Sequence, residues 1–298
     1  MLRYRKIYYA FSGTLVIMSI ISLAVLGLNF GVDFKGGSIM EITSVSSRPN
    51  HDVIINVLSE LDLGNVTIQD SGDANLILRF QNIDETVHQN VLSKLKGLFE
   101  FAEVRFESIG PVIGGETKQK SLWAISLVVI MILVYVAWAF RRISFPLRSW
   151  KYGVVAVIAL FHDIVITMGV FAFVGHFLNL EIGVPFVAAL LTILGYSVND
   201  TIVIFDRIRE NVLRQGSVFD FAKVIDASFN QVYVRSLNTS LSTLLVLVAV
   251  FLFGGETLKY FVLTLIIGIS IGTYSSIFLA SPLLFSWSLL KIKRPKRA

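Results

Sequence analysis

The chain has 298 residues, a formal net charge of +5, a mean hydropathy of +0.71 and 54% hydrophobic residues. Soluble proteins contain roughly 45–50% apolar residues, and several apolar runs here reach the roughly 20 residues that cross a bilayer as a helix. These features indicate an integral membrane protein with room for one small soluble domain. Cysteine is absent, which excludes disulfides, thiolate metal sites and cysteine nucleophiles.

The first apolar run predicts a retained membrane helix. Basic residues in Met1–Lys6 precede an apolar stretch over 7–28. A signal peptide has a shorter apolar region, roughly 7–15 residues, that ends at a small-x-small cleavage site. No such site follows here, so residues 1–28 are expected to form a cytoplasmic N-terminus and transmembrane helix 1.

Residues 29–120 predict a folded domain, because their hydrophobic residues are spaced and their charges are mixed. The order of elements is β-α-β-β-α-β, the pattern of a ferredoxin-like α+β domain. Asn50 is a predicted helix N-cap, and His51 and His88 are expected at the surface. The predicted strands cover 38–45, 66–69, 75–80 and 102–109, and the predicted helices cover 50–63 and 83–99.

Glycine-rich pieces bracket this domain at 31–38 and 110–116. Neither contains the phosphate-binding pattern G-x-x-x-x-G-K-[ST], which is absent from the whole chain. Glycine permits bends and close approach of backbones, so these pieces are expected to act as hinges or close-packing points.

Residues 121–290 predict transmembrane helices 2–6, followed by a basic cytoplasmic tail over 291–298. An amphipathic elbow helix is expected near 218–232, at the cytoplasmic membrane surface. Small residues in the last span predict close helix packing. The expected spans are about 122–140, 152–174, 182–205, 233–253 and 260–284, and the small residues are Gly268, Ser270, Gly272, Ser275, Ser276 and Ala280.

The distribution of Lys and Arg predicts the orientation. Three lie at the N-terminus, four between spans two and three, five between spans four and five, and five at the C-terminus. The opposite loops, 175–181 and 254–259, hold none and one. Both termini are therefore expected in the cytoplasm, with the large domain outside.

Asp200 is a carboxyl group inside the fourth span. Insertion of an acid there costs a few kcal/mol, so Asp200 requires a partner, a proton or water. On a helix, Tyr196 and Ser197 share its face. A proton or ion site is one interpretation, and a structural polar contact between helices is the other.

Arg235 opens the fifth span, and Asn238, Thr239 and Ser242 continue one polar stripe along it. This stripe is expected to face Asp200 and Asn199. A carboxylate paired with Arg235 stays charged, whereas one that loses its partner in apolar surroundings binds a proton. Protonation would thereby be coupled to helix arrangement. The alternative for Arg235 is a snorkelling side chain at a helix end.

Asp163 lies near the expected membrane midplane, next to His162. A structural pair and a member of a proton relay are both open for these two residues. No nucleophile–base set and no metal-ligand spacing occur in the sequence, so we expect no catalytic residue, no metal and no cofactor.

Four segments resemble the SecF family of the bacterial SecD–SecF protein-export complexes, within the RND (resistance-nodulation-division) superfamily. They are Gly31–Gly37 after the first span, Gly195–Asn211 in the fourth, Arg235–Ser240 at the start of the fifth, and Phe161-His162-Asp163. The resemblance implies an RND-like half with six membrane helices, placed in the bacterial inner membrane with the 29–120 loop periplasmic.

The resemblance also implies partners and a mechanism. SecD would supply the other half, and the complex would associate with the SecYEG channel, YajC and a translocating preprotein. Proton flow would drive export after an ATP-driven stage. By motif position Asp200 is the intramembrane acid and Arg235 the basic residue, with Asn199, Asn238 and Asp163 as further relay candidates. Sodium could replace the proton.

Three other functions fit parts of this pattern. Half of an RND-type exporter of lipids or small hydrophobic molecules has the same outline. A non-transporting scaffold would use the polar residues only to hold helices together. A membrane enzyme fits least, because the sequence shows no catalytic set.

Overall fold

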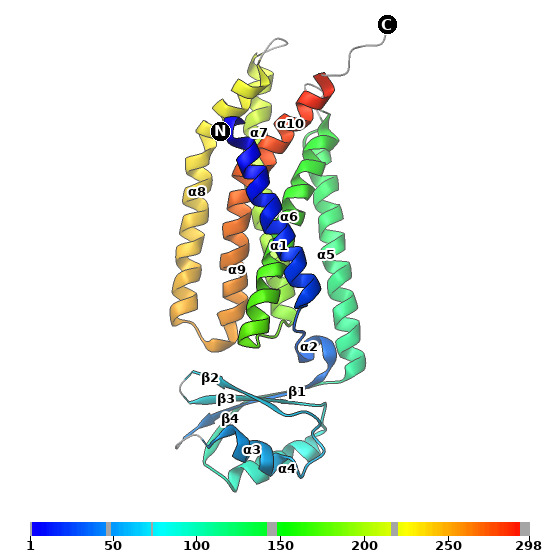
Figure 1. The fold of residues 1–298 in the computed structure, drawn as a ribbon, viewed down its shortest axis with the longest axis vertical. Coiled ribbons are helices and arrows are strands. Elements are labelled where there is room, and N and C mark those ends of the chain that lie inside the picture. The colour runs from blue at the N-terminus through cyan, green and yellow to red at the C-terminus, as the bar shows by residue number, and fades with distance from the viewer. Residues whose placement is uncertain (1, 46–48, 73, 142–147, 216–219, 293–298) are drawn as a thin grey trace. The chain divides into compact units, whose positions relative to one another are not determined.

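The computed structural model describes residues 2–45, 49–72, 74–141, 148–215 and 220–292. The chain forms two compact units (Figure 1), and we describe each by itself. The helical unit comprises Met1–Asn29, Trp123–Leu180 and Pro185–Ala298. The α+β unit comprises Phe30–Leu122 and the short segment Glu181–Val184.

Within the described residues, six helical segments are long and apolar enough to cross a membrane, which confirms the predicted polytopic fold. The last of them changes to a π-helix part of the way along. The segments are α1 (Arg5–Val25, after the 3-10 turn Leu2–Tyr4), α5 (Pro111–Ala139), α6 (Ser149–Leu178), α7 (Val184–Gln215), α8 (Phe221–Phe253), and the span built from α9 (Glu256–Ser275), η2 (Ser276–Ala280) and α10 (Ser281–Ile292).

The helices differ in how much of their surface the chain itself covers. In α6 and in the α9–α10 span, 61% of the most apolar window is buried, against 11%, 6% and 11% in α1, α5 and α8. Helices that are apolar all round face lipid or another chain where their own chain leaves them uncovered. In α7 the buried share is 44%. Buried polar residues of the membrane helices therefore belong mainly to α6, α7 and the α9–α10 span.

Close approach of α1 and α6 depends on Gly169. A Cβ at this position would lie 2.5 Å from the Ser19 Cα atom. We therefore expect Gly169→Ala to lower the free energy of unfolding by about 1–3 kcal/mol, as overpacking does in other cores. Unfolding of the purified chain in detergent micelles measures this. Gly13→Ala in α1 is the control, because a Cβ there meets nothing within 4 Å; equal losses in both variants would contradict the packing argument.

The elbow helix expected near 218–232 is not a separate element. Residues 218 and 219 lie outside the described residues, and from Phe221 the chain runs without a break into the fifth span as α8. Val224 and Ile225 are fully buried in the same apolar cluster as Ile204 and Ile208 of α7. The apolar face of this segment packs on the end of α7, so the prediction of a surface helix was wrong.

Two other boundaries differ from the prediction. Helix α5 begins at Pro111, where proline suits the first helical position, rather than near 122. Helix α10 ends at Ile292, so most of the predicted basic tail lies outside the described residues.

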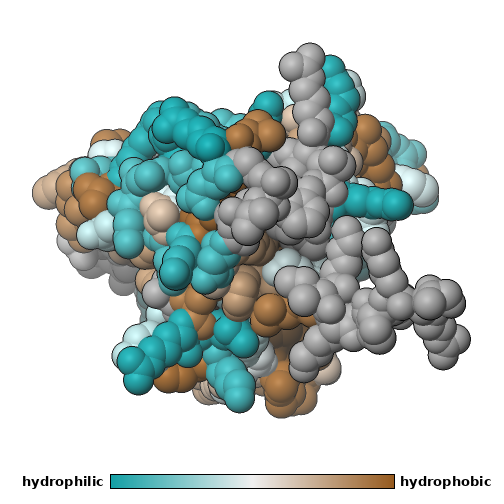
Figure 2. Space-filling model, turned by 90° about the horizontal axis from the view of Figure 1, so that it is seen from above, coloured by the Kyte–Doolittle hydropathy of each residue, from teal (hydrophilic) through white to brown (hydrophobic). Residues whose placement is uncertain are grey.

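Figure 2 views the end of the bundle at which α7 ends and α8 begins, and shows many hydrophilic residues there, interrupted by hydrophobic patches. Arg207, Arg209 and Arg214 lie in the last part of α7, and Arg5 begins α1. This polar, basic end contrasts with the apolar middle of the helices.

The α+β unit contains a four-stranded antiparallel sheet in the order β2-β3-β1-β4. This order and the sequence of elements confirm the ferredoxin-like prediction. Met40 and Leu78 are among its fully buried residues. The elements are the short helix α2 (Val32–Lys35), β1 (Gly37–Ser44), α3 (His51–Leu58), β2 (Thr67–Ser71), β3 (Asn75–Phe80), α4 (Glu85–Lys96) and β4 (Phe101–Ile109).

Local predictions in this unit have mixed outcomes. Asn50 is the N-cap of α3, with its side chain accepting from Asp52 N. His88, expected at the surface, is buried: its ring stacks on Phe106 with centroids 3.7 Å apart, and Nε2 lies 2.8 Å from a carboxylate oxygen of Glu103. Histidine is a polar residue, so the sequence pattern alone suggested exposure. Phe106, the aromatic residue that covers it, lies on another element, β4.

Candidate functional site: two buried acids in the helical unit

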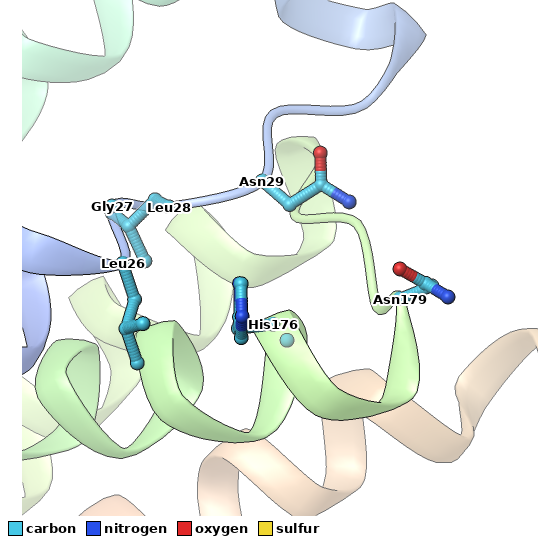
Figure 3. A pocket seen from close by; sticks show the side chains of 7 residues that line it. Leu26, Gly27, Leu28, Asn29, His176 and Asn179 are labelled. Carbon is cyan, nitrogen blue, oxygen red and sulfur yellow. The ribbon is translucent and has the colours of Figure 1, made fainter.

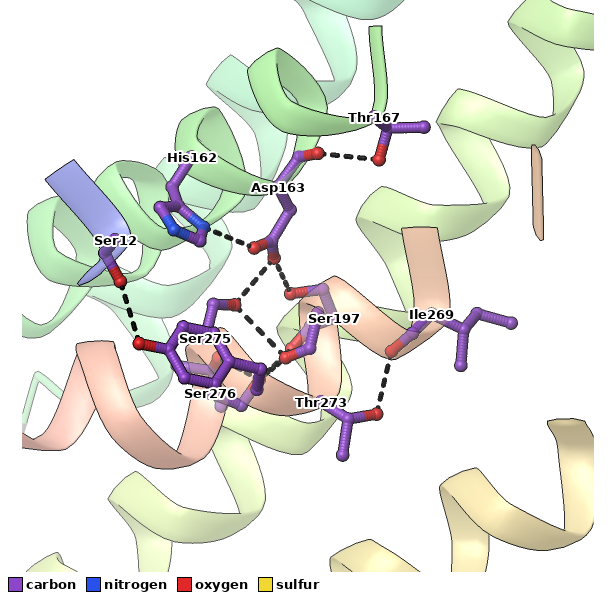
Figure 4. A network of polar contacts seen from close by, with 12 residues as sticks. Ser12, His162, Asp163, Thr167, Ser197, Ile269, Thr273, Ser275 and Ser276 are labelled. Carbon is purple, nitrogen blue, oxygen red and sulfur yellow. Dashed lines mark hydrogen bonds and ion pairs between the residues drawn. The ribbon is translucent and has the colours of Figure 1, made fainter. Parts of the chain in front are cut away.

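Asp163 lies near the middle of α6 and is fully buried. Ser197 Oγ of α7 and Ser275 Oγ of α9 donate to its Oδ2 atom at 2.6 and 2.8 Å, and His162 Nδ1 lies 3.0 Å from Oδ1 (Figure 4). Hydrogen bonds from hydroxyl groups to an ionised carboxylate are stronger than neutral ones. Three helices thus converge on one carboxyl group, with donors at both of its oxygens.

His162 completes this cluster on the side of α1. Its Nε2 atom is buried and has no hydrogen-bond partner among the described residues. Its ring lies 6.3 Å from that of Tyr274, whose hydroxyl is 3.2 Å from Ser12 Oγ of α1. The arrangement fits a structural pair and a relay member equally, as the sequence did.

Asp200 has a poorer set of donors. It is 4% exposed, and its one hydrogen bond among the described residues comes from Ser240 Oγ of α8, at 3.3 Å. Ser240 is itself 2.8 Å from Thr273 Oγ1 of α9 and 3.5 Å from the Tyr196 hydroxyl. Because a buried charge needs several partners, this acid is the less completely solvated of the two.

Hydroxyl groups continue from one acid toward the other. Ser276 Oγ lies 3.2 Å from the carbonyl oxygen of Ser197, and 3.1 Å from Thr201 Oγ1. Ser197 also binds Asp163, and Thr201 follows Asp200 in α7. Residues of α7 and of the last span therefore form a polar seam that starts at Asp163 and reaches Thr201.

Two backbone features of the last span lie beside this seam, a glycine at position 272 and a π-helix that starts at Ser276. A Cβ at Gly272 would lie 3.0 Å from Ser197 Cβ and 3.6 Å from Asp163 Oδ2, so a side chain there would crowd the cluster. The π-helix starts directly afterwards, at Ser276. Such π segments are frequent at functional sites.

The predicted polar stripe of α8 does not face Asp200. Arg235 and Asn238 are exposed, Asn199 is exposed on α7, and no ion pair joins Asp200 to Arg235 among the described residues. The expected pairing was therefore wrong within this chain.

Helical periodicity explains the difference. Ser236 and Ser240 are four residues apart and both are buried, so they define the inward face of α8. Arg235 and Asn238 lie on other faces. The four polar residues of the stripe do share exposure on α8, but they face away from Asp200.

Four hydroxyl residues of the site were missed. Ser240 and Thr273 were not singled out as partners of Asp200, and Ser275 and Ser276 were treated only as small packing residues. Hydroxyl side chains spaced three or four apart on an apolar helix were the available signal. Ser270, expected to pack with them, is exposed.

A separate pocket of about 290 Å³ lies where α1 and α6 end (Figure 3). Neither acid lines it. No group of three His, Asp or Glu side chains that could hold a metal ion occurs in the part of the chain that the structure describes. The lining residues are Leu26, Gly27, Leu28, Asn29, Gly175, His176 and Asn179.

Two family models match the chain. "Protein export membrane protein SecD/SecF, C-terminal" matches residues 89–289, and "SecD/SecF GG Motif" matches residues 21–46. Relatives described as protein translocase subunit SecF include one from Sebaldella termitidis, 40% identical over 100% of this chain and 94% of its own length. Another, from Vibrio alginolyticus, is 38% identical over 97% of this chain and 90% of its own length.

Solved structures agree. The crystal structure of a Thermus SecDF, a translocon-associated membrane protein, superposes with a TM-score of 0.84 at 28% identity, over 97% of this chain. This chain spans 38% of that SecDF chain. SecDF in a super-membrane-facing form gives a TM-score of 0.68 over 98% of this chain. The chain therefore belongs to the SecF family of protein-export membrane proteins.

Proposed function

We propose that this chain, together with a SecD partner, uses the proton-motive force to promote preprotein translocation across the inner membrane. The observation that carries the proposal is Asp200, a carboxyl group buried in a membrane helix with one long hydrogen bond among the described residues. A charged acid so placed is costly, and intramembrane acids of this kind mark proton and ion pathways. We assign proton uptake and release to Asp200.

The polar seam supports a role for Asp163 in the same pathway. Hydroxyl groups can donate and accept in turn, and the contacts of Ser276 run from Ser197, which donates to Asp163, to Thr201, the residue after Asp200. Asp163 accepts hydrogen bonds from Ser197 and Ser275 and forms the end of the seam opposite the Asp200 segment. A sodium ion in place of the proton is the alternative that the same oxygen-rich seam allows.

Arg235, Asn238 and Asn199 are assigned to the SecD partner. A charged side chain exposed on a membrane helix needs a pairing group, and this chain does not supply one to Arg235 among the described residues. We therefore place Arg235 opposite a carboxylate of SecD, with Asn199 and Asn238 beside it. The relay thereby becomes complete only in the assembled pair.

The orientation follows from the basic residues. Lys and Arg are retained in cytoplasmic loops, and Arg207, Arg209 and Arg214 in the last part of α7 support a cytoplasmic position for this end of the helix. Both termini are then cytoplasmic and the α+β unit is periplasmic. There it meets preprotein that leaves the SecYEG channel, with YajC as a further member of the complex.

Inner-membrane vesicles from cells depleted of this chain provide the test. We expect export of a translocation intermediate to proceed by ATP alone and to lose its gradient-dependent part, which returns when the chain is supplied with SecD. SecD and SecYEG are expected to copurify with it. A gradient-dependent efflux of small hydrophobic molecules, with no effect on export, would favour an exporter and contradict the proposal.

A further inference from the structure

The segment Glu181–Val184 joins α6 to α7, the two helices that carry the acids, yet it belongs to the α+β unit. Ile182 forms a parallel bridge with Phe30. Gly31 N donates to the carbonyl oxygen of Ile182 at 2.9 Å. The backbone that links the two acid-bearing helices is thus paired with the segment that precedes the sheet.

Asp33 caps α7 from a distant part of the chain. Its Oδ2 atom accepts a hydrogen bond from Val184 N, the first residue of α7, at 2.8 Å. The first N–H groups of a helix have no partner within it, and a carboxylate there also suits the helix dipole. Asp33 therefore holds the start of the helix that carries Asp200.

An ion pair, without the geometry of a hydrogen bond, joins the same segment to the sheet. Glu181 Oε2 lies 3.1 Å from Arg79 Nε in β3, with side chains 25% and 18% exposed. Arg79 Nη1 also donates to Gln69 Oε1 of β2 at 2.9 Å. The guanidinium group of Arg79 in β3 is thus positioned by Gln69 of β2 and lies beside the Glu181 carboxylate.

The helix α5 begins against residues 34–36. Gly36 has φ +79°, and a Cβ on it would lie 2.6 Å from Pro111 Cα. A Cβ on Gly114 would lie 2.7 Å from Gly36 N. Only glycine permits this conformation and this approach. We call residues 30–37, 110–115 and 181–184 the glycine junction.

We propose that Asp33 and the Glu181–Arg79 pair are positioning residues for proton-driven export. They hold the first turn of α7 in the glycine junction, so that a rearrangement of α7 at Asp200 moves the α+β unit. This inference rests on the proposed function. Asp200 follows Val184 by 16 residues of one continuous helix, about 24 Å at 1.5 Å per residue. A hydrogen-bonded helix of this length transmits a rotation or shift only if its far end is held.

Two matched sets of variants test the proposal in vesicles that contain the whole SecD–SecF complex. Asp33→Ala is expected to reduce gradient-dependent export at least several-fold, whereas Asp33→Asn, which also caps helices, retains most of it. Arg79→Glu and Glu181→Arg are each expected to reduce it, and the double exchange Arg79→Glu/Glu181→Arg to restore most of it. The ATP-driven part and the amount of complex stay unchanged in all of them.

Other outcomes overturn the proposal. Wild-type export in Asp33→Ala would show that the cap is dispensable. Equal loss in Asp33→Ala and Asp33→Asn, a double exchange no better than the single ones, or parallel loss of the ATP-driven part would reduce these contacts to general stability.

Hydrogen exchange separates this proposal from the proposed function, because it does not depend on export. In the complex, Asp200→Asn is expected to change amide exchange in residues 31–37, and Asp33→Ala is expected to remove that change. Absence of any change, or an equal change in both backgrounds, would contradict transmission through the junction. Export that keeps its gradient dependence in Asp200→Asn would instead contradict the role of Asp200.

Discussion

Asp200→Asn is expected to abolish the gradient-dependent part of export and to leave the ATP-driven part near its wild-type level. Asparagine has the shape of aspartate and keeps an oxygen that can accept from Ser240 Oγ. It cannot gain or lose a proton at neutral pH. Removing a potential charge from a buried position also lowers the cost of insertion, so the variant should fold and assemble. Export of a translocation intermediate in vesicles, with and without a proton gradient, measures the effect.

Asp206→Asn is the matched control. Asp206 lies on the same helix and is exposed, and its carboxylate accepts from Arg209 Nη1 at 3.1 Å. Such surface ion pairs contribute about 0–1 kcal/mol, so export should match the wild type. Gradient-dependent export that survives in Asp200→Asn at equal protein levels would remove Asp200 from the mechanism.

Asp163→Ala is expected to cause the largest loss of stability of any variant considered. Ser197 and Ser275 donate to Asp163 Oδ2, and both are buried. Alanine leaves the Ser197 hydroxyl group without an acceptor and leaves Ser275 only the more distant carbonyl oxygen of Gly272, at 3.1 Å. An unsatisfied buried group costs about 1–3 kcal/mol, and the weakened Ser275 bond adds to this. The free energy of unfolding in micelles should therefore fall by about 2–4 kcal/mol.

Two comparisons show whether the hydroxyl groups are the cause. Asp163→Asn keeps an acceptor oxygen and should lose less stability than Asp163→Ala. Adding Ser197→Ala and Ser275→Ala to Asp163→Ala should recover part of the loss, because the unsatisfied groups are then gone. A triple variant less stable than Asp163→Ala would mean that these hydroxyl groups find other partners.

The sequence predicted those parts of the fold that local rules determine. Strand β3 occupies Asn75–Phe80 as expected, and Asn50 caps α3, because alternation and capping depend on neighbouring residues. The beginning of α8 was misplaced because its apolar residues pack on α7. Periodicity identifies an apolar face but does not show whether that face meets lipid or protein.

The site shows the same limit. Asp163 and Asp200 were identified because a charge within an apolar span is costly wherever the helix packs. The contribution of Ser240 could not be read, since serine is common in membrane helices for packing alone. The pairing of Arg235 with Asp200 was wrong within this chain because the stripe of Arg235 faces outward, and a polar stripe does not itself show which way it faces.

The register of the sheet has a consequence for how this family can change. Gly37 pairs with Ile109 on neighbouring antiparallel strands, and residues so paired lie about 5 Å apart. The segment Phe30–Leu122 thus enters and leaves the sheet at almost the same point, as in insertions that host proteins tolerate well. A fold closed in this way can change in size between the first and second membrane helices, provided that Asp33 and Arg79 keep their contacts with residues 181–184. Evolution could thereby vary the α+β unit while the six membrane helices stayed the same.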